Sequence, residues 1–147
     1  MSYPEGMPKE YGQACPVARS LTFLGERWTL LVIRDLLRGP KKFQELADSL
    51  TGVAPGVLSR RLKDLESYGI VERRVYVDHP PRAEYALTDK GRELRPVVSS
   101  LAVWGARHMS TEKMLRHADC GHAIEMAYFC PHCEAVVAGE RVGFSPR

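Results

Sequence analysis

The segment between residues 51 and 82 concentrates side chains that could bind a polyanion. Consecutive residues of a helix turn by about 100°, so a helix that buries Leu58, Leu62 and Leu65 turns a second set of residues outward together. That outward set consists of Gly56, Ser59, Arg60, Lys63 and Ser67. Val57 and Tyr68 are expected on the buried side with the leucines. Hydroxyl, guanidinium and ammonium groups on one face can donate hydrogen bonds to the base edges and phosphates of duplex DNA. The spacing therefore predicts a DNA-reading helix.

The expected DNA contacts extend beyond this helix. We expect Arg60 to make a bidentate contact to guanine, whereas Lys63 and Ser59 could reach bases or phosphates. The phosphate contacts are expected from cations beside that helix face and on a following hairpin: Lys41, Lys42, Arg61, Arg73, Arg74 and Arg82. Binding should weaken steeply with salt, because cations on phosphates release condensed counterions. The alternative is a solvated helix face, since 27% of all residues are charged.

A second cluster, near the C-terminus, has the residue types and spacing of a metal site. His117 and Cys120 are separated by two residues, and so are Cys130 and Cys133. Two such pairs on short hairpins can converge tetrahedrally on one ion. Four protein ligands leave no open coordination position, so the expected zinc is structural and not catalytic. The pattern resembles a short zinc ribbon.

The fourth ligand and the role of the thiols have alternatives. His117 stands where a typical ribbon has cysteine, and His122 is a second choice; we prefer His117 because it keeps the two-residue spacing. The cluster could instead be free thiols with surface histidines. A thiol redox protein that uses Cys130 and Cys133 as a thioredoxin-type dithiol is another alternative, but it needs a βαβ context that the neighbouring sequence does not show.

Composition restricts the class of protein. A chain of 147 residues with 44% hydrophobic residues suits one compact domain plus a small appendage, and the net charge of +3 is only mildly basic. No apolar run approaches the ~20 residues that cross a bilayer, so we expect a soluble, cytoplasmic protein without a membrane partner. Nothing resembles a glycine-rich phosphate loop or a serine nucleophile beside histidine, so no enzyme is predicted.

The expected elements follow the order of a winged helix-turn-helix. Helices are predicted at 16–24, 26–37, 43–50 and 55–68, and strands at 70–77 and 83–87 with a proline-stiffened tip between them. A long helix is predicted from the cap Thr88 to about His108, weakened or bent near Pro96. Its apolar surface exceeds what a small domain can cover, which favours a partner subunit.

The predicted fold class is α+β. It comprises a winged helix-turn-helix with a long C-terminal dimerisation helix and a small zinc-ribbon-like appendage. The predicted organisation is a flexible arm at residues 1–13, the DNA-binding and dimerisation domain at 14–109, and the zinc-ribbon-like extension and tail at 113–147.

Five runs of the chain, dispersed but in order, carry a family resemblance. They are Cys15-Pro16-Val17-Ala18-Arg19, Leu24 to Leu31 (LGERWTLL), Phe43 to Leu46 (FQEL), Leu58 to Glu66 (LSRRLKDLE) and Tyr85 to Gly91 (YALTDKG). Together they resemble the HxlR family of bacterial transcriptional regulators, which are similar to MarR proteins. The resemblance implies a winged-helix homodimer that binds a pseudo-palindromic operator in double-stranded DNA. The first and last helices would form the dimer, and the two reading helices would lie roughly 34 Å apart.

Cys15 directly precedes the first expected helix. The positive end of a helix dipole favours the reactive thiolate, and Arg19 lies one turn further on. Some members of the family that this chain resembles sense oxidants, quinones or aldehydes through a cysteine at this place. Cys15 is therefore a candidate redox sensor, although we prefer an unreactive thiol packed at a dimer interface. A small-molecule or electrophile effector is compatible with the sequence, which identifies none.

Overall fold

The computed structural model describes residues 10–109 and 112–144. The chain divides into two compact units, which we call the winged unit (residues 1–98) and the C-terminal unit (residues 99–147). The boundary between them falls inside the last helix. Most of the predicted N-terminal arm, residues 1–9, lies outside the described residues, and residues 10–13 form neither helix nor strand.

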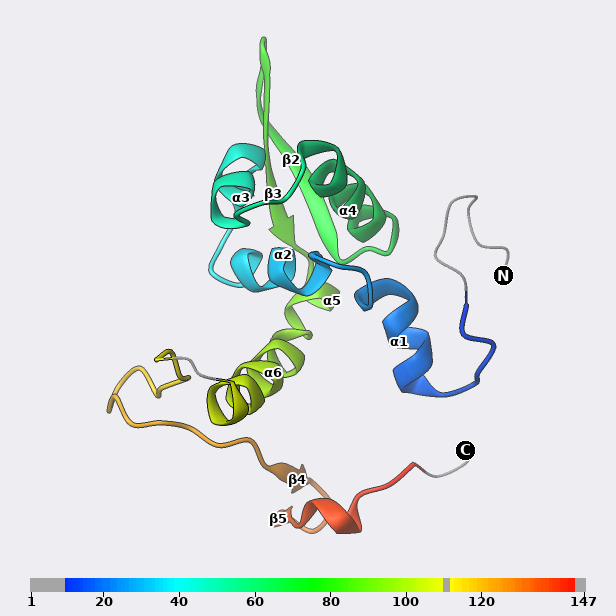
Figure 1. The fold of residues 1–147 in the computed structure, drawn as a ribbon, viewed down its shortest axis with the longest axis vertical. Coiled ribbons are helices and arrows are strands. Elements are labelled where there is room, and N and C mark those ends of the chain that lie inside the picture. The colour runs from blue at the N-terminus through cyan, green and yellow to red at the C-terminus, as the bar shows by residue number, and fades with distance from the viewer. Residues whose placement is uncertain (1–9, 110–111, 145–147) are drawn as a thin grey trace. The chain divides into compact units, whose positions relative to one another are not determined.

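The winged unit packs helices against a small antiparallel sheet (Figure 1). Its elements are α1 (Pro16–Leu24), α2 (Thr29–Leu36), β1 (Lys41–Lys42), α3 (Phe43–Ser49), α4 (Pro55–Ser67), β2 (Val71–Asp78), β3 (Pro81–Leu87), α5 (Asp89–Arg92) and the start of α6 (Arg95–His108). The sheet has the strand order β1-β3-β2. This is the predicted α+β winged helix-turn-helix, and the predicted elements occur in the expected order; the two-residue strand β1 was not predicted.

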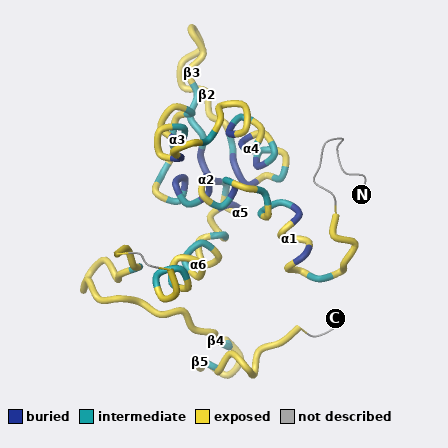
Figure 2. The backbone as a smooth tube through the Cα atoms, in the orientation of Figure 1, coloured by how far each residue is buried: buried dark blue, intermediate teal, exposed yellow. Residues whose placement is uncertain are grey.

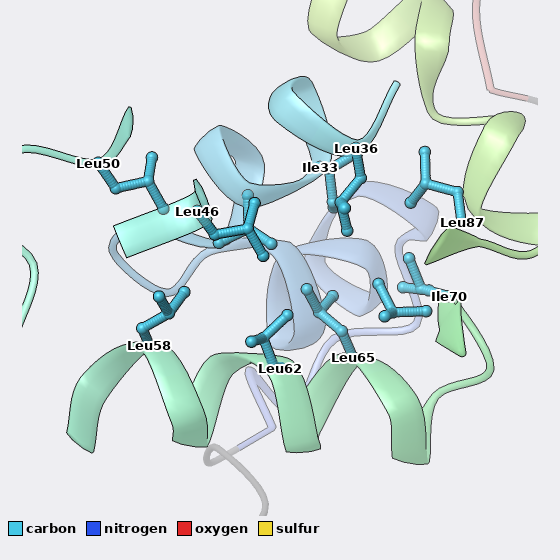
Figure 3. Close-up of a cluster of buried hydrophobic side chains, with 11 residues drawn as sticks. Ile33, Leu36, Leu46, Leu50, Leu58, Leu62, Leu65, Ile70 and Leu87 are labelled. Carbon is cyan, nitrogen blue, oxygen red and sulfur yellow. The ribbon is translucent and has the colours of Figure 1, made fainter. Parts of the chain in front are cut away.

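The core lies where α4 packs against α2, α3 and the base of the sheet. Leu58, Leu62 and Leu65 point from one side of α4 toward the other buried side chains (Figure 3). Burial is concentrated in this part of the molecule, whereas the far end of the β2–β3 hairpin is exposed (Figure 2). The 3.6-residue periodicity of the leucines thus determines which side of α4 faces outward.

The second helix begins three residues later than predicted. Trp28 adopts a left-handed backbone conformation, with φ of 78°, and α2 starts at Thr29. The Trp28 ring packs against the core, and the Arg27 guanidinium lies 5.2 Å from the ring centroid. The prediction of a helix from Glu26 onward was wrong, because the chain turns sharply at Trp28 and its indole packs against the core.

The predicted continuous helix at 88–108 is also wrong, because it is interrupted between α5 and α6. Thr88 caps α5 as expected, and its Oγ1 accepts a hydrogen bond of 3.1 Å from the Gly91 N–H. Pro96 has no N–H for the carbonyl of Arg92, and its ring would clash there, so the helix ends at Arg92 and resumes at Arg95. Gly91 is required by close packing, since a Cβ there would lie 2.2 Å from the carbonyl oxygen of Ile70.

The hairpin formed by β2 and β3, which we call the wing, is longer than predicted. Pairing runs from Val71 opposite Leu87 to Asp78 opposite Pro81, with a bulge between Val75 and Val77. The predicted five-residue tip thus shrinks to residues 79 and 80. The wing projects beyond α3 and α4 (Figure 1).

The C-terminal unit has a different character. It contains most of α6, the short hairpin of β4 (Tyr128–Cys130) and β5 (Ala135–Val137), and the 3-10 turn η1 (Gly139–Arg141). None of its described residues is buried (Figure 2). Its secondary structure is therefore not supported by a hydrophobic core of its own.

Candidate nucleic-acid interface

The outward side of α4 carries a pair of free cations. Arg60 and Lys63 are both exposed, and within the described part of the chain neither makes a hydrogen bond or ion pair. Ser59 is half-buried beside them. Val57, which the sequence placed on the buried side, is 39% exposed, so that expectation was wrong. An exposed valine next to these cations adds an apolar group that could contact a thymine methyl.

The N-terminus of α4 is a feature that sequence reasoning missed. The helix begins with Pro55, and its N-cap Ala54 supplies no side-chain hydrogen bond. The first-turn N–H groups of a helix have no partner within the helix, and together with the dipole they attract phosphate. The signal was present in the sequence, since an alanine before a proline begins this helix without the usual capping side chain.

Arg61 differs from its neighbours on α4. Its side chain is only 14% exposed and pairs with Asp64 at 3.0 Å and with Glu26 at 3.4 Å. Burial raises the pKa of the nearby Tyr68 hydroxyl, and the Asp64 carboxylate raises it further. The pair with Asp64 lies within α4, whereas the pair with Glu26 joins α4 to the turn before α2. We therefore assign Arg61 to positioning α4, whereas the sequence placed it at a phosphate.

The base of the wing arranges the other predicted cations in two rows across the sheet. Lys41 and Arg73 both lie opposite Tyr85 of β3, and Lys42 and Arg74 both lie opposite Glu84. Residues directly opposite on paired strands share one face of a sheet, so each row places two cations on the same face.

The second row is partly neutralised. Arg74 pairs with Glu72 of its own strand, and the Lys42 ammonium lies 5.6 Å from the ring centroid of Tyr76. Lys42 is also the N-cap residue of α3, and its backbone N–H donates to Glu45 Oε2 at 2.7 Å. Both Arg74 and its carboxylate partner are about half exposed, so a phosphate can compete for the guanidinium.

Arg82 lies near the end of the wing, opposite Val77. It is exposed, and among the residues that the structure describes it has no ion-pair partner. The wing therefore carries a free cation well beyond the core as well as cations at its base.

Cys15 is the N-cap residue of α1 and is half-buried. Its carbonyl accepts a hydrogen bond of 3.0 Å from the Arg19 N–H, which places Arg19 one turn along the helix, as expected. The thiol itself makes no capping hydrogen bond.

Two helices present apolar side chains to solvent. On α1, Val17 is 52% exposed and Leu21 is 41% exposed. On α6, Val97, Leu101 and Trp104 recur at the spacing of one helix face, and Trp104 is 55% exposed. None of the residues of α6 is buried. Apolar stripes of this kind are typical of surfaces that are covered in an assembly.

The predicted zinc ligands are brought together only in pairs. His117 Nδ1 lies 3.2 Å from Cys120 Sγ. The backbone N–H and the side chain of Cys133, followed by the N–H of His132, lower the pKa of the Cys130 thiol. Among residues 10–109 and 112–144, no group of three or more potential ligands lies close enough to hold one metal ion. The structure thus does not support a preassembled four-ligand site.

The helices and the family of the chain are considered first. Within the described residues, no helix is long and apolar enough to cross a membrane. The sequence matches the profile of the HxlR-like helix-turn-helix family over residues 23–113. The chain belongs to this family.

Individual relatives agree with the family assignment. The chain is 38% identical over 103 residues to sll1512 of Synechocystis sp., an uncharacterized HTH-type transcriptional regulator, with 70% of this chain and 76% of that protein covered. The members of the family are DNA-binding transcriptional regulators and not enzymes, and so is this HxlR-like chain.

Solved structures show the same fold. The crystal structure of PA1607, described as a candidate transcription factor, matches with a TM-score of 0.78 at 30% identity and covers 92% of this chain and 97% of that one. The reduced form of HypR, described as a redox regulator, matches with a TM-score of 0.62 at 33% identity and covers 65% of this chain and 95% of HypR.

Proposed function

We propose that this HxlR-like regulator binds a pseudo-palindromic operator as a homodimer, with α4 of each subunit in the major groove. The observation that carries the proposal is the free pair Arg60 and Lys63 on the side of α4 opposite its buried leucines. An exposed helix face with uncommitted cations can donate to base edges without first breaking an internal ion pair. Arg61, which is next to Arg60 on α4, lacks that freedom because it pairs with Asp64 and Glu26.

Each contact has a distinct role in this proposal. Arg60 reads guanine through a bidentate pair of hydrogen bonds, and Lys63 and Ser59 bind nearby bases or phosphates. The uncapped start of α4 receives a phosphate. The flanking phosphates are bound by Lys41, Lys42, Arg73, Arg74 and Arg82.

The homodimer follows from the apolar stripe of α6 and from the exposed side chains of α1. Val97, Leu101 and Trp104 remain 41–55% exposed among the described residues of their own chain. A second copy with the same stripe would bury these side chains, as an isologous interface does. Two-fold symmetry in the protein then predicts two half-sites about one turn of DNA apart, roughly 34 Å.

The proposal is tested by selecting bound sequences from a random duplex pool with the full chain. We expect an inverted repeat. Arg60→Ala should then lower the affinity for the selected operator about 5- to 150-fold and relax the preference at one base pair, because a bidentate pair contributes about 1–3 kcal/mol of discrimination.

The matched control is Arg141→Ala, which removes an exposed cation of the C-terminal unit. It should leave operator affinity unchanged. Equal affinities of the wild-type chain, Arg60→Ala and Lys63→Ala would contradict the proposed reading face. Selection of a single, unrepeated half-site would contradict the symmetric homodimer.

We also propose that a thiol-reactive electrophile modulates DNA binding through Cys15. The half-buried thiol at the start of α1 lies next to a surface that the homodimer covers, and HypR is described as a redox regulator. An adduct on this sulfur would alter how α1 packs. Treatment with a quinone should change operator affinity of the wild-type chain but not of Cys15→Ser, and an equal response of both would exclude Cys15 as the sensor.

A further inference from the structure

The first histidine–cysteine pair forms a compact turn, residues 117–121, which we call the first knuckle. The Gly121 N–H donates to the His117 carbonyl at 2.8 Å, and the His117 N–H donates to the His122 carbonyl at 2.8 Å. Gly121 has φ of +71°, a left-handed conformation that glycine adopts readily. The turn brings His117 Nδ1 to 3.2 Å from Cys120 Sγ, so the two donor atoms face the same point.

The second pair, residues 130–134, forms a matching second knuckle at the end of the β4–β5 hairpin. Cys130 pairs with Ala135 across the β4–β5 ladder, so Cys133 lies in the tight turn between these two residues. Glu134 has φ of +50°, so the residue after the second ligand is left-handed here as well. A non-glycine residue in this region has a conformational cost, so the rest of the turn must hold Glu134 in this conformation. Both knuckles therefore share ligand spacing and backbone geometry.

The environment of His117 distinguishes its two ring nitrogens. Nε2 lies 3.5 Å from Asp119 Oδ2, on the other edge of the ring from the nitrogen that faces Cys120. Histidines that ligate a metal commonly donate their second N–H to a carboxylate, which fixes the tautomer and orientation of the ring. This arrangement leaves Nδ1 for a metal and favours His117 over His122 as the ligand.

The C-terminal unit also needs a stabilising element that side-chain burial does not provide. Phe129 is 62% exposed and Val136 is 68% exposed, and no described residue of the unit is buried. Units below about 70 residues rarely gain enough stability from one hydrophobic core and commonly add a metal, a disulfide or a partner. The cysteines of the unit are free thiols, which excludes the second of these in this structure.

We propose that His117 Nδ1 and the sulfurs of Cys120, Cys130 and Cys133 bind one structural Zn²⁺ ion. The knuckles are two half-sites that the structure does not bring together, and residues 124–127 between them form neither helix nor strand. Closure of this connecting segment joins the half-sites around the ion. Each thiol gives up its proton to solvent when it ligates, and the filled tetrahedral shell leaves no position for substrate.

The test uses the full chain purified without chelator, with its metal content measured by mass spectrometry. We expect one zinc per chain. Replacement of zinc by Co²⁺ should produce the intense visible bands of a tetrahedral site and sulfur-to-cobalt charge transfer. Two results would overturn the site. One is protein that is purified without zinc and whose Co²⁺ complex shows no sulfur-to-cobalt charge transfer; the other is half an equivalent of zinc per chain.

Variants test the ligand set. Cys120→Ser, Cys133→Ser and His117→Gln should each lose stoichiometric zinc, whereas His122→Gln and Cys15→Ser should retain it as matched controls. Asp119→Asn should weaken zinc affinity about 10- to 100-fold. Loss of zinc in His122→Gln with retention in His117→Gln would overturn the assignment of the fourth ligand.

Discussion

The winged unit and the C-terminal unit are both rich in apolar side chains, but only the first buries them. Leu58, Leu62 and Leu65 are each at most 1% exposed, whereas Phe129 and Val136 of the second unit are more than 60% exposed. The helices of the winged unit give each apolar residue neighbours on several sides, and the short hairpin of the C-terminal unit offers only one layer. The comparison shows that apolar composition contributes to stability only where several elements enclose it.

The largest expected effect tests this comparison directly. Leu62→Ala removes buried methyl groups from a packed core and should lower the free energy of unfolding by about 2–5 kcal/mol. Phe129→Ala, which removes a larger but exposed side chain, should lower it by less than about 0.5 kcal/mol. Urea denaturation of both full-length variants, followed by circular dichroism, measures the difference. A comparable loss in Phe129→Ala would show that the hairpin is packed in solution.

A smaller effect separates the two neighbouring arginines of α4. Arg61→Ala leaves Asp64 and Glu26 without their cation and should cost about 1–2 kcal/mol of stability, because that side chain is mostly buried. Arg60→Ala should change stability by less than about 0.5 kcal/mol. The same denaturation experiment checks both. If the two substitutions cost the same, the distinction between a positioning and a reading arginine fails.

The smallest expected effect concerns the end of the wing. Arg82→Ala removes one phosphate contact, so the slope of log affinity against log salt concentration should become shallower by about 0.9. Affinity should fall by a similar factor for operator and for unrelated duplex, because a phosphate contact carries no sequence information. Fluorescence anisotropy over a salt series measures both quantities. A loss confined to the operator would instead assign Arg82 to base reading.

Helix α4 was the element most completely predicted from the sequence. The leucine spacing determined the buried side of α4 and thereby the exposure of Arg60 and Lys63, since a helix of known period has only one arrangement of its faces. The error at Val57 arose because periodicity predicts the centre of the buried face of a helix but not how wide that face is. How far a core extends around a helix depends on which elements lie beside it.

The status of individual cations could not be predicted in this way. Arg60 and Arg61 are adjacent and chemically identical in the sequence, yet only Arg61 meets Glu26, which lies far from it along the chain. The break between α5 and α6 was anticipated only as a bend, because Pro96 was recognised but the turn at residues 93 and 94 depends on packing against the core.

The sequence by itself determined the family, the order of the main elements and the two residue pairs that we propose as metal ligands, because these depend on residue type and local spacing. The tertiary structure decided which cations are free, where the indole of Trp28 forces α2 to begin, and which nitrogen of His117 faces Cys120. Those features depend on contacts between residues in different elements or on the path of the backbone. Local periodicity and propensity carry no information about such contacts, since they arise only when the chain is packed.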